Sequence, residues 1–237
     1  MRDLVTRLMR GPSSLAIAGM VVNGANLVAN LTLARMLDPH SYGAVVELTN
    51  IFMILSMIGS SLQVAVVQRD TAIEEQGRTA TRAWIRRLRG KCIAGVAVAT
   101  LAGLALARPV CALLSFPHRI AFAEVVAAAA LWSAISIERG LLQSRAAYPT
   151  LARNLSYEGA VRVVGTIVLV GIGAGVDGAS AALIIGLLVG IEHARRASAL
   201  TVRPARSGRR GGPSAAARAA AAPRGGAPRA PARGRRG

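Results

Sequence analysis

Six apolar stretches, each close to the length needed to cross a lipid bilayer, dominate this sequence of 237 residues. A spanning helix needs about 17–25 predominantly apolar residues, whereas a soluble domain interrupts its apolar segments with charge every few residues. The predicted spans are residues 13–36, 44–68, 92–114, 120–137, 159–176 and 179–192. We therefore expect an all-α fold, a polytopic transmembrane helix bundle of about six spans formed by residues 1–200.

The segments between the spans are polar or contain residues typical of turns. Residues 116–119 (FPHR) and the pair Asp177-Gly178 are each predicted to form a turn. The charged stretch 69–91 is too polar to span; it is either an amphipathic helix on the membrane surface or a loop. Residues 138–157, which include Pro149, are predicted to be a polar linker.

The distribution of positive charge predicts the orientation in the membrane. The formal net charge is +18, which is compatible with either nucleic-acid binding or cytoplasmic anchoring of helices. Basic residues gather before the first span, between spans two and three, between spans four and five, and after span six, while the other connections hold few. This alternation predicts six spans with both termini in the cytoplasm, and it argues against a specific nucleic-acid partner.

The C-terminal residues 201–237 form a second region of different composition. From residue 204 onwards they contain only Ala, Arg, Gly, Pro and Ser, a set that cannot build a core, so we expect a disordered tail. Three interpretations of the tail compete. It binds anionic lipid headgroups, it binds nucleic acid without specificity, or it has no selected role. The last interpretation is favoured, because these residues have GC-rich codons and an out-of-frame stretch would look the same. The same composition suggests a bacterial chain in a plasma membrane.

The sequence contains none of the motifs that would indicate an enzyme or a metal site. A Ser-His-Asp set, a His-Glu-x-x-His motif and a phosphate-binding loop are all lacking, and the three histidines are isolated. Cys92 and Cys111 on one helix would be roughly 28 Å apart, too far for a disulfide. We therefore predict a non-enzymatic protein without a cofactor or metal.

Polar residues inside the spans are the candidates for a substrate cavity, because such residues usually face the bundle interior or a water-filled space. Asn23, Asn26 and Asn30 share one face of the first span, where they either line a cavity or form hydrogen bonds between helices. In the second span Glu47 and Asn50 share a face. Arg35 lies at the matching end of the first span and would either pair with Glu47 or supply positive charge for an anionic substrate.

One charged pair is predicted within the fifth span. Glu158 and Arg162 lie four residues apart, so a pair between them would reduce the cost of burying the arginine. The structural interpretation is favoured, and the alternative is that Arg162 is a cavity cation that contacts substrate phosphates.

Several stretches resemble the bacterial polysaccharide and oligosaccharide flippases of the multidrug/oligosaccharidyl-lipid/polysaccharide exporter superfamily. Residues 33–43 (LARMLDPHSYG) are similar to the A-R-x-L-G-P-x-x-Y-G signature at the first hairpin of that family, with Asp38 in place of the usual glycine. Residues 64–69 (VAVVQR), 138–143 (ERGLLQ) and 157–162 (YEGAVR) are similar to other parts of its N-terminal half.

The resemblance implies transport of lipid-linked oligosaccharide or polysaccharide precursors by alternating access, with membrane lipids and the lipid-linked glycan as binding partners. By position, Arg35 corresponds to the arginine of the hairpin motif and Arg162 to a basic residue of the fifth span. The family has twelve to fourteen spans, whereas this chain has about six. Three alternatives follow: two copies of the chain associate, a different chain supplies the other half, or the chain is an inactive truncated half. The last alternative is favoured.

Two other functions compete with this one. The first is a drug/cation antiporter of the same superfamily, for which a membrane acidic residue should titrate with transport. The second is a non-transporting membrane scaffold that recruits partners through the basic tail.

Overall fold

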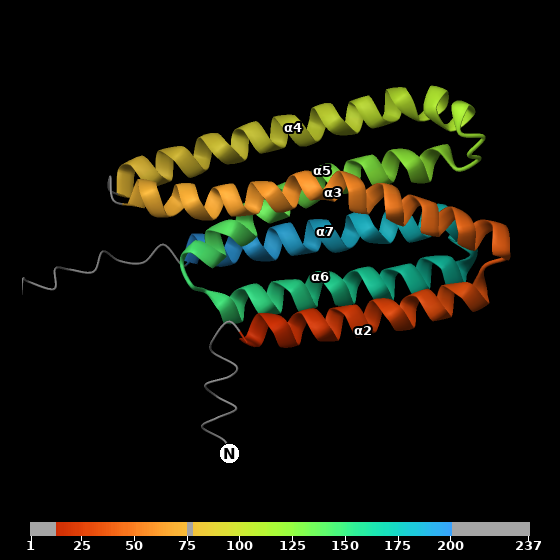
Figure 1. Cartoon of the computed structure of the whole chain (residues 1–237), viewed down its shortest axis with the longest axis horizontal. Helices are drawn as coiled ribbons and strands as arrows, with labels where there is room; N and C mark the ends of the chain where they lie inside the picture. Colours follow the sequence, from red (N-terminus) through yellow and green to blue (C-terminus); the bar gives the residue numbers. More distant parts are fainter. Residues whose placement is uncertain (1–12, 75–77, 201–237) are drawn as a thin grey trace, which may run out of the picture. The chain divides into compact units, whose positions relative to one another are not determined.

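The computed structural model describes residues 13–74 and 78–200, and the regular elements in these two ranges are all helical (Figure 1). They are α2 (Ser13–Met36), α3 (Pro39–Glu74), α4 (Arg78–Leu113), α5 (Arg119–Ser144), α6 (Tyr148–Leu169), the short η1 (Val170–Ala174) and α7 (Gly175–Leu200). The all-α prediction is confirmed. The predicted disordered tail, residues 201–237, lies outside the described residues.

Five stretches are long and apolar enough to cross a membrane, and the last of them, Tyr148–Ala199, consists of two helices. Its 52 residues would make a continuous helix of roughly 78 Å, more than twice the hydrocarbon thickness. Instead the chain reverses at η1, and residues of α6 and α7 meet in antiparallel order, Gly165 facing Ala182 and Arg162 facing Gly186. The prediction of about six spans therefore holds.

The reversal lies a few residues before the predicted turn at Asp177-Gly178. Gly173 and Gly175 have φ angles of 95° and 56°, which glycine adopts without the steric cost that a side chain would bring. Asp177 instead lies in the first turn of α7, where its Oδ1 accepts a hydrogen bond of 3.1 Å from the backbone N–H of Ala121. An acidic group near the N-terminus of α5 is also favoured by the helix dipole.

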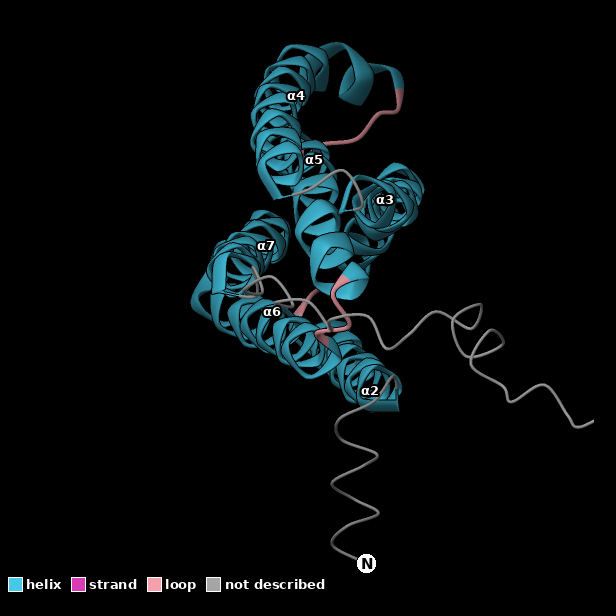
Figure 2. Ribbon diagram, turned by 90° about the vertical axis from the view of Figure 1, so that its left-hand side faces the viewer, coloured by secondary structure: helices cyan, strands magenta, loops and turns pink. Residues whose placement is uncertain are grey.

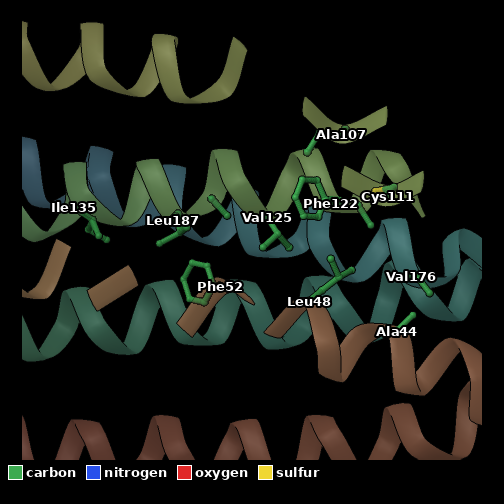
Figure 3. Packing of buried hydrophobic residues seen from close by; sticks show 14 residues of the cluster. Ala44, Leu48, Phe52, Ala107, Cys111, Phe122, Val125, Ile135, Val176 and Leu187 are labelled. Atoms are coloured by element: carbon green, nitrogen blue, oxygen red, sulfur yellow. The ribbon is translucent and has the colours of Figure 1, made fainter. Parts of the chain in front are cut away.

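The central helix of the bundle is α5, which packs against α3, α4 and α7 (Figure 2). Its run of small residues around Ala127–Ala129 is buried and lets neighbouring helices approach closely. The largest apolar cluster includes Phe52 of α3, Val125 and Ile135 of α5, and Leu187 of α7 (Figure 3). Phe52 also meets Trp132 edge to face, with ring centroids 5.9 Å apart.

The charged stretch 69–91 forms neither a surface helix nor a long loop. α3 continues to Glu74 and α4 begins at Arg78, so both helices extend well beyond their apolar parts. Ile85 and Leu88 pack against Val66 of α3, together with Trp84. The apolar side of this stretch therefore faces the protein, and its described residues continue α3 and α4.

The predicted polar linker 138–157 is also mostly helical. α5 extends to Ser144, α6 begins at Tyr148, and Pro149 occupies the first turn of α6, where proline is tolerated. The connection is only three residues long, Arg145–Ala147.

Asp38 gives a local reason for the departure from the hairpin signature. Its Oδ1 accepts hydrogen bonds from the backbone N–H groups of His40 and Ser41, at 3.0 and 3.1 Å. These bonds cap the N-terminus of α3, whose first residue is Pro39. The hydrogen bonds from Ser41, followed by that from His40, hold the pKa of the Asp38 carboxyl below its ordinary value.

We predict that Gly186→Val destabilises the bundle, because a Cβ at Gly186 would lie 2.9 Å from Arg162 Cβ and 3.1 Å from the carbonyl oxygen of Glu158. Overpacking of this kind costs about 1–3 kcal/mol of unfolding free energy. The matched control is Gly24→Val, where an added Cβ meets no atom within 4 Å. Titration with a denaturing detergent should separate the two variants, and equal stability would contradict the close packing of α6 on α7.

Candidate functional site

A groove with several polar side chains lies between α2 and α3, and it is the candidate substrate site. α2 packs along α6 and makes few contacts with α3, so the two helices diverge after their short connection (Figure 2). The groove has a volume of about 260 Å³, and residues of α6 and α7 close it on the inner side. The polar side chains on its walls are Asn26, Asn30, Thr49, Arg162, Thr166 and Ser180.

Arg162 of α6 carries the only formal charge among the residues that line this groove in the described part of the chain. Its Nη2 donates a hydrogen bond of 3.1 Å to Asn26 Oδ1 on α2. Its Nε lies 3.5 Å from Glu158 Oε1, one helical turn earlier, and one fifth of its side chain is exposed. The guanidinium is therefore oriented from both sides while part of it stays accessible to a ligand in the groove.

Glu158 connects Arg162 to a second, fully buried arginine. Arg139 Nη2 of α5 lies 3.4 Å from Glu158 Oε2, and both side chains are only 3% exposed. Arg139 Nε also donates a hydrogen bond of 2.8 Å to Asn154 Oδ1, and its guanidinium lies over the ring of Trp132. One carboxylate between two guanidinium groups leaves a formal excess of one positive charge beside the groove, an arrangement suited to an anionic ligand.

Asn154 extends this network to α7. Its Nδ2 donates a hydrogen bond of 2.7 Å to the carbonyl oxygen of Gly190 and lies 3.3 Å from His193 Nδ1. Asn154 is completely buried, so these bonds satisfy an amide that would otherwise be costly to desolvate. The row Arg139–Glu158–Arg162 is thereby fixed to α2, α5, α6 and α7.

The structure places the predicted site residues in two groups. Asn26, Asn30 and Arg162 line the same groove, and the predicted pair between Glu158 and Arg162 is present. The other four candidates, Asn23, Arg35, Glu47 and Asn50, are exposed and are not among its lining residues. The suggested ion pair between Arg35 and Glu47 is wrong, because within residues 13–73 and 79–199 neither side chain forms a salt bridge.

Sequence reasoning missed Arg139 and the hydroxyl groups of Thr49, Thr166 and Ser180. The sequence predicts a linker at Arg139, although the spacing of this residue from the apolar residues of α5 continues the helical pattern. The hydroxyl residues carry no signal of their own, because threonine and serine in a span commonly bond to their own helix, as Thr49 does with Val45.

A second buried polar cluster joins the helices near the Arg69–Lys91 stretch. Arg89 donates two hydrogen bonds of 2.6 Å to the carboxylate of Glu138, and Ser198 Oγ lies 3.0 Å from the same carboxylate. Nearby, Ser144 Oγ donates to Asp70 Oδ2 at 2.6 Å. The bidentate pair is satisfied within the protein, so we interpret this cluster as a clamp between α4, α5 and α7 and not as a ligand site.

Comparison with known proteins assigns a family to most of the chain. Residues 8–191 match the family described as "Polysaccharide biosynthesis protein". The chain belongs to this polysaccharide biosynthesis family. The match covers the described helices from α2 to most of α7, including every residue that lines the groove. No curated protein and no solved structure matches the chain.

For this member of the polysaccharide biosynthesis family we predict that Glu158→Gln lowers the unfolding free energy by about 3–5 kcal/mol. The substitution leaves two arginines, one of them fully buried, without their carboxylate. Glu192→Gln is the matched control, because Glu192 and Arg196 form the same i, i+4 pair with both side chains more than half exposed. Its expected effect is below about 0.5 kcal/mol in the same detergent titration. A similar loss of unfolding free energy in both variants would show that burial of Arg139, Glu158 and Arg162 adds nothing to the stability of the bundle.

Proposed function

We propose that the chain forms one bundle of a flippase-like membrane transporter that moves lipid-linked oligosaccharide or polysaccharide precursors across the plasma membrane. Membership of the polysaccharide biosynthesis family and helices of membrane-spanning length support a membrane protein of this class. The observation that carries the proposal is Arg162, a partly accessible guanidinium held by Glu158 and Asn26 in a groove lined by several polar side chains, within the apolar stretch Tyr148–Ala199.

The chemistry of the groove fits a lipid diphosphate that carries a sugar. A guanidinium forms bidentate, charge-assisted hydrogen bonds with phosphate oxygens, and Asn26 orients Arg162 for that purpose. Asn30 and Thr49 are exposed and offer an amide and a hydroxyl oxygen of the kind that bind sugar hydroxyls. Transport by this route needs binding and release on opposite sides of the membrane, without covalent catalysis.

The open side of the groove supports a requirement for a second bundle as a partner. Asn23, Asn30, Glu47 and Asn50 are exposed on α2 and α3 within the apolar stretches, and polar groups at that depth are costly against lipid. A second half, from another copy or another chain, would enclose them in a hydrated cavity. Arg35, at the end of α2, would then face the mouth of that cavity.

The lining of the groove favours an anionic substrate over a cationic drug. A cation antiporter needs an acidic group that can lose its proton to the substrate pathway. Among the described residues that line the groove none is acidic, and Glu124 only accepts a hydrogen bond from the lining residue Ser180.

We predict that Arg162→Gln weakens binding of a fluorescent prenyl diphosphate to the full chain in nanodiscs by at least about tenfold, the usual worth of a charge-assisted hydrogen bond. Arg162→Lys should retain part of the affinity because it keeps the charge. Arg196→Gln, which removes an exposed arginine outside the groove, is the control. If the wild type and Arg162→Gln bind the probe equally, the proposed substrate site is refuted.

We also predict that both termini and the connection between α3 and α4 are cytoplasmic. In a background without Cys92 and Cys111, His40→Cys should react with a membrane-impermeant maleimide in intact cells. Arg82→Cys should react only after permeabilisation. Both positions are exposed, so access depends on the side of the membrane alone. Labelling of Arg82→Cys in intact cells would show that the orientation in the membrane is the opposite of the proposed one.

A further inference from the structure

A second groove, on the other side of α3, differs from the first in being almost entirely apolar. Figure 2 shows α3 and α4 on two sides of α5. The groove is lined by residues of these three helices, and its volume is about 440 Å³. Leu55, Ile58 and Leu62 form one wall, Val96 and Ala99 belong to the other, and Ala130 of α5 lies at the base. Gly95 leaves the groove open, because a Cβ added there would meet no atom within 4 Å.

The groove is closed at one end and has a cation at the other. At one end α4 touches α5, where a Cβ on Gly103 would lie 2.8 Å from Val126 Cγ1. At the other end the lining includes Lys91, whose side chain is exposed and which is the only lysine in the sequence. Arg87, also exposed, lies one helical turn before Lys91 on the same side of α4.

The length of the groove matches one leaflet of a membrane. The lining residues of α4 run from Leu88 to Ala99, and those of α5 from Val126 to Ile137. Each set covers roughly 16 Å of helix, about half of the ~30 Å hydrocarbon thickness. A transmembrane helix of a partner would need a groove along the full thickness, whereas an acyl chain occupies one leaflet.

The volume and charge point to the same occupant. If a methylene group takes roughly the ~30 Å³ of a water molecule, about 440 Å³ holds on the order of fifteen of them, the size of one acyl chain. An ammonium group where the chain would meet the headgroup layer attracts phosphate. A zwitterionic headgroup would gain much less from Lys91 and Arg87.

We propose that this groove binds an anionic glycerophospholipid, with an acyl chain between α3 and α4 and the phosphate on Lys91. The lipid belongs to the leaflet on the Lys91 side, which is the cytoplasmic leaflet in the topology proposed above. The site is separate from the Arg162 groove and does not depend on transport, so the two proposals succeed or fail independently.

The test uses the full chain in phosphatidylcholine nanodiscs doped with a phospholipid that carries a diazirine on its acyl chain. After irradiation, mass spectrometry quantifies the cross-links on the lining residues of α4 and α5. Phosphatidylglycerol should label these residues about fivefold more than phosphatidylcholine, the preference expected from one basic residue at an anionic surface. Lys91→Gln should lower this ratio at least about twofold, and Arg86→Gln, an exposed arginine outside the groove, should leave it unchanged.

A second pair of variants tests the groove itself. Gly95→Leu should fill it and reduce cross-linking of both lipids several-fold. Gly90→Leu should have no effect, because Gly90 lies on the same helix outside the groove and also has open space at its Cβ.

Three results would overturn the proposal. They are equal labelling by the two lipids in the wild type, an unchanged ratio in Lys91→Gln, and unchanged labelling in Gly95→Leu. Displacement of the phosphatidylglycerol probe by an equimolar prenyl phosphate would also overturn it, by assigning the groove to the lipid carrier of a glycan.

Discussion

The polar side of the bundle depends on Glu158, which lies buried between two arginines. Because an isolated charge is costly to bury, Arg139, Glu158 and Arg162 are stable only as a set, and each must stay within reach of the next. Asn26 and Asn154 then bind the two ends of the row, so that α2, α5, α6 and α7 are held in one register. The tight approach of α7 at Gly186 and Gly190, both beside Glu158, belongs to the same arrangement. A ligand-accessible guanidinium is thus a consequence of how the helices are held together.

The parts of the fold that depend on local composition could be predicted from the sequence. Apolar stretches of spanning length identify the helices, because the backbone of a chain in lipid must satisfy its own hydrogen bonds. Helical spacing also placed Asn26 and Asn30 on one face, and both line the Arg162 groove. The turn before α7 was misplaced because Asp177-Gly178 is a strong local signal, while the glycines at positions 173 and 175 take the positive φ angles.

The rest could not be predicted, because it depends on contacts between distant helices. The sequence predicts a linker at Glu138 and Arg139, because hydropathy falls after Ile137. In a membrane protein, however, such a fall marks either the membrane boundary or a set of polar contacts inside the protein, and one sequence does not distinguish them. Here α5 continues to Ser144 because Glu138 binds Arg89 and Arg139 binds Asn154. The same limit hid the extension of α3 and α4, where Ile85 packs on Val66.

Both grooves arise from the position of α3, which forms one wall of each. α3 packs on the central α5 but diverges from α2 and from α4, its neighbours in the sequence, so a space opens on each side of it. The chemistry of each space is then set by the facing helix, with Asn26 and Asn30 on the α2 side and Val96 and Ala99 on the α4 side. Phe52 and Leu48 line the first groove, and Leu55 and Ile58 line the second. The position of α3 on α5 therefore sets the width of both grooves.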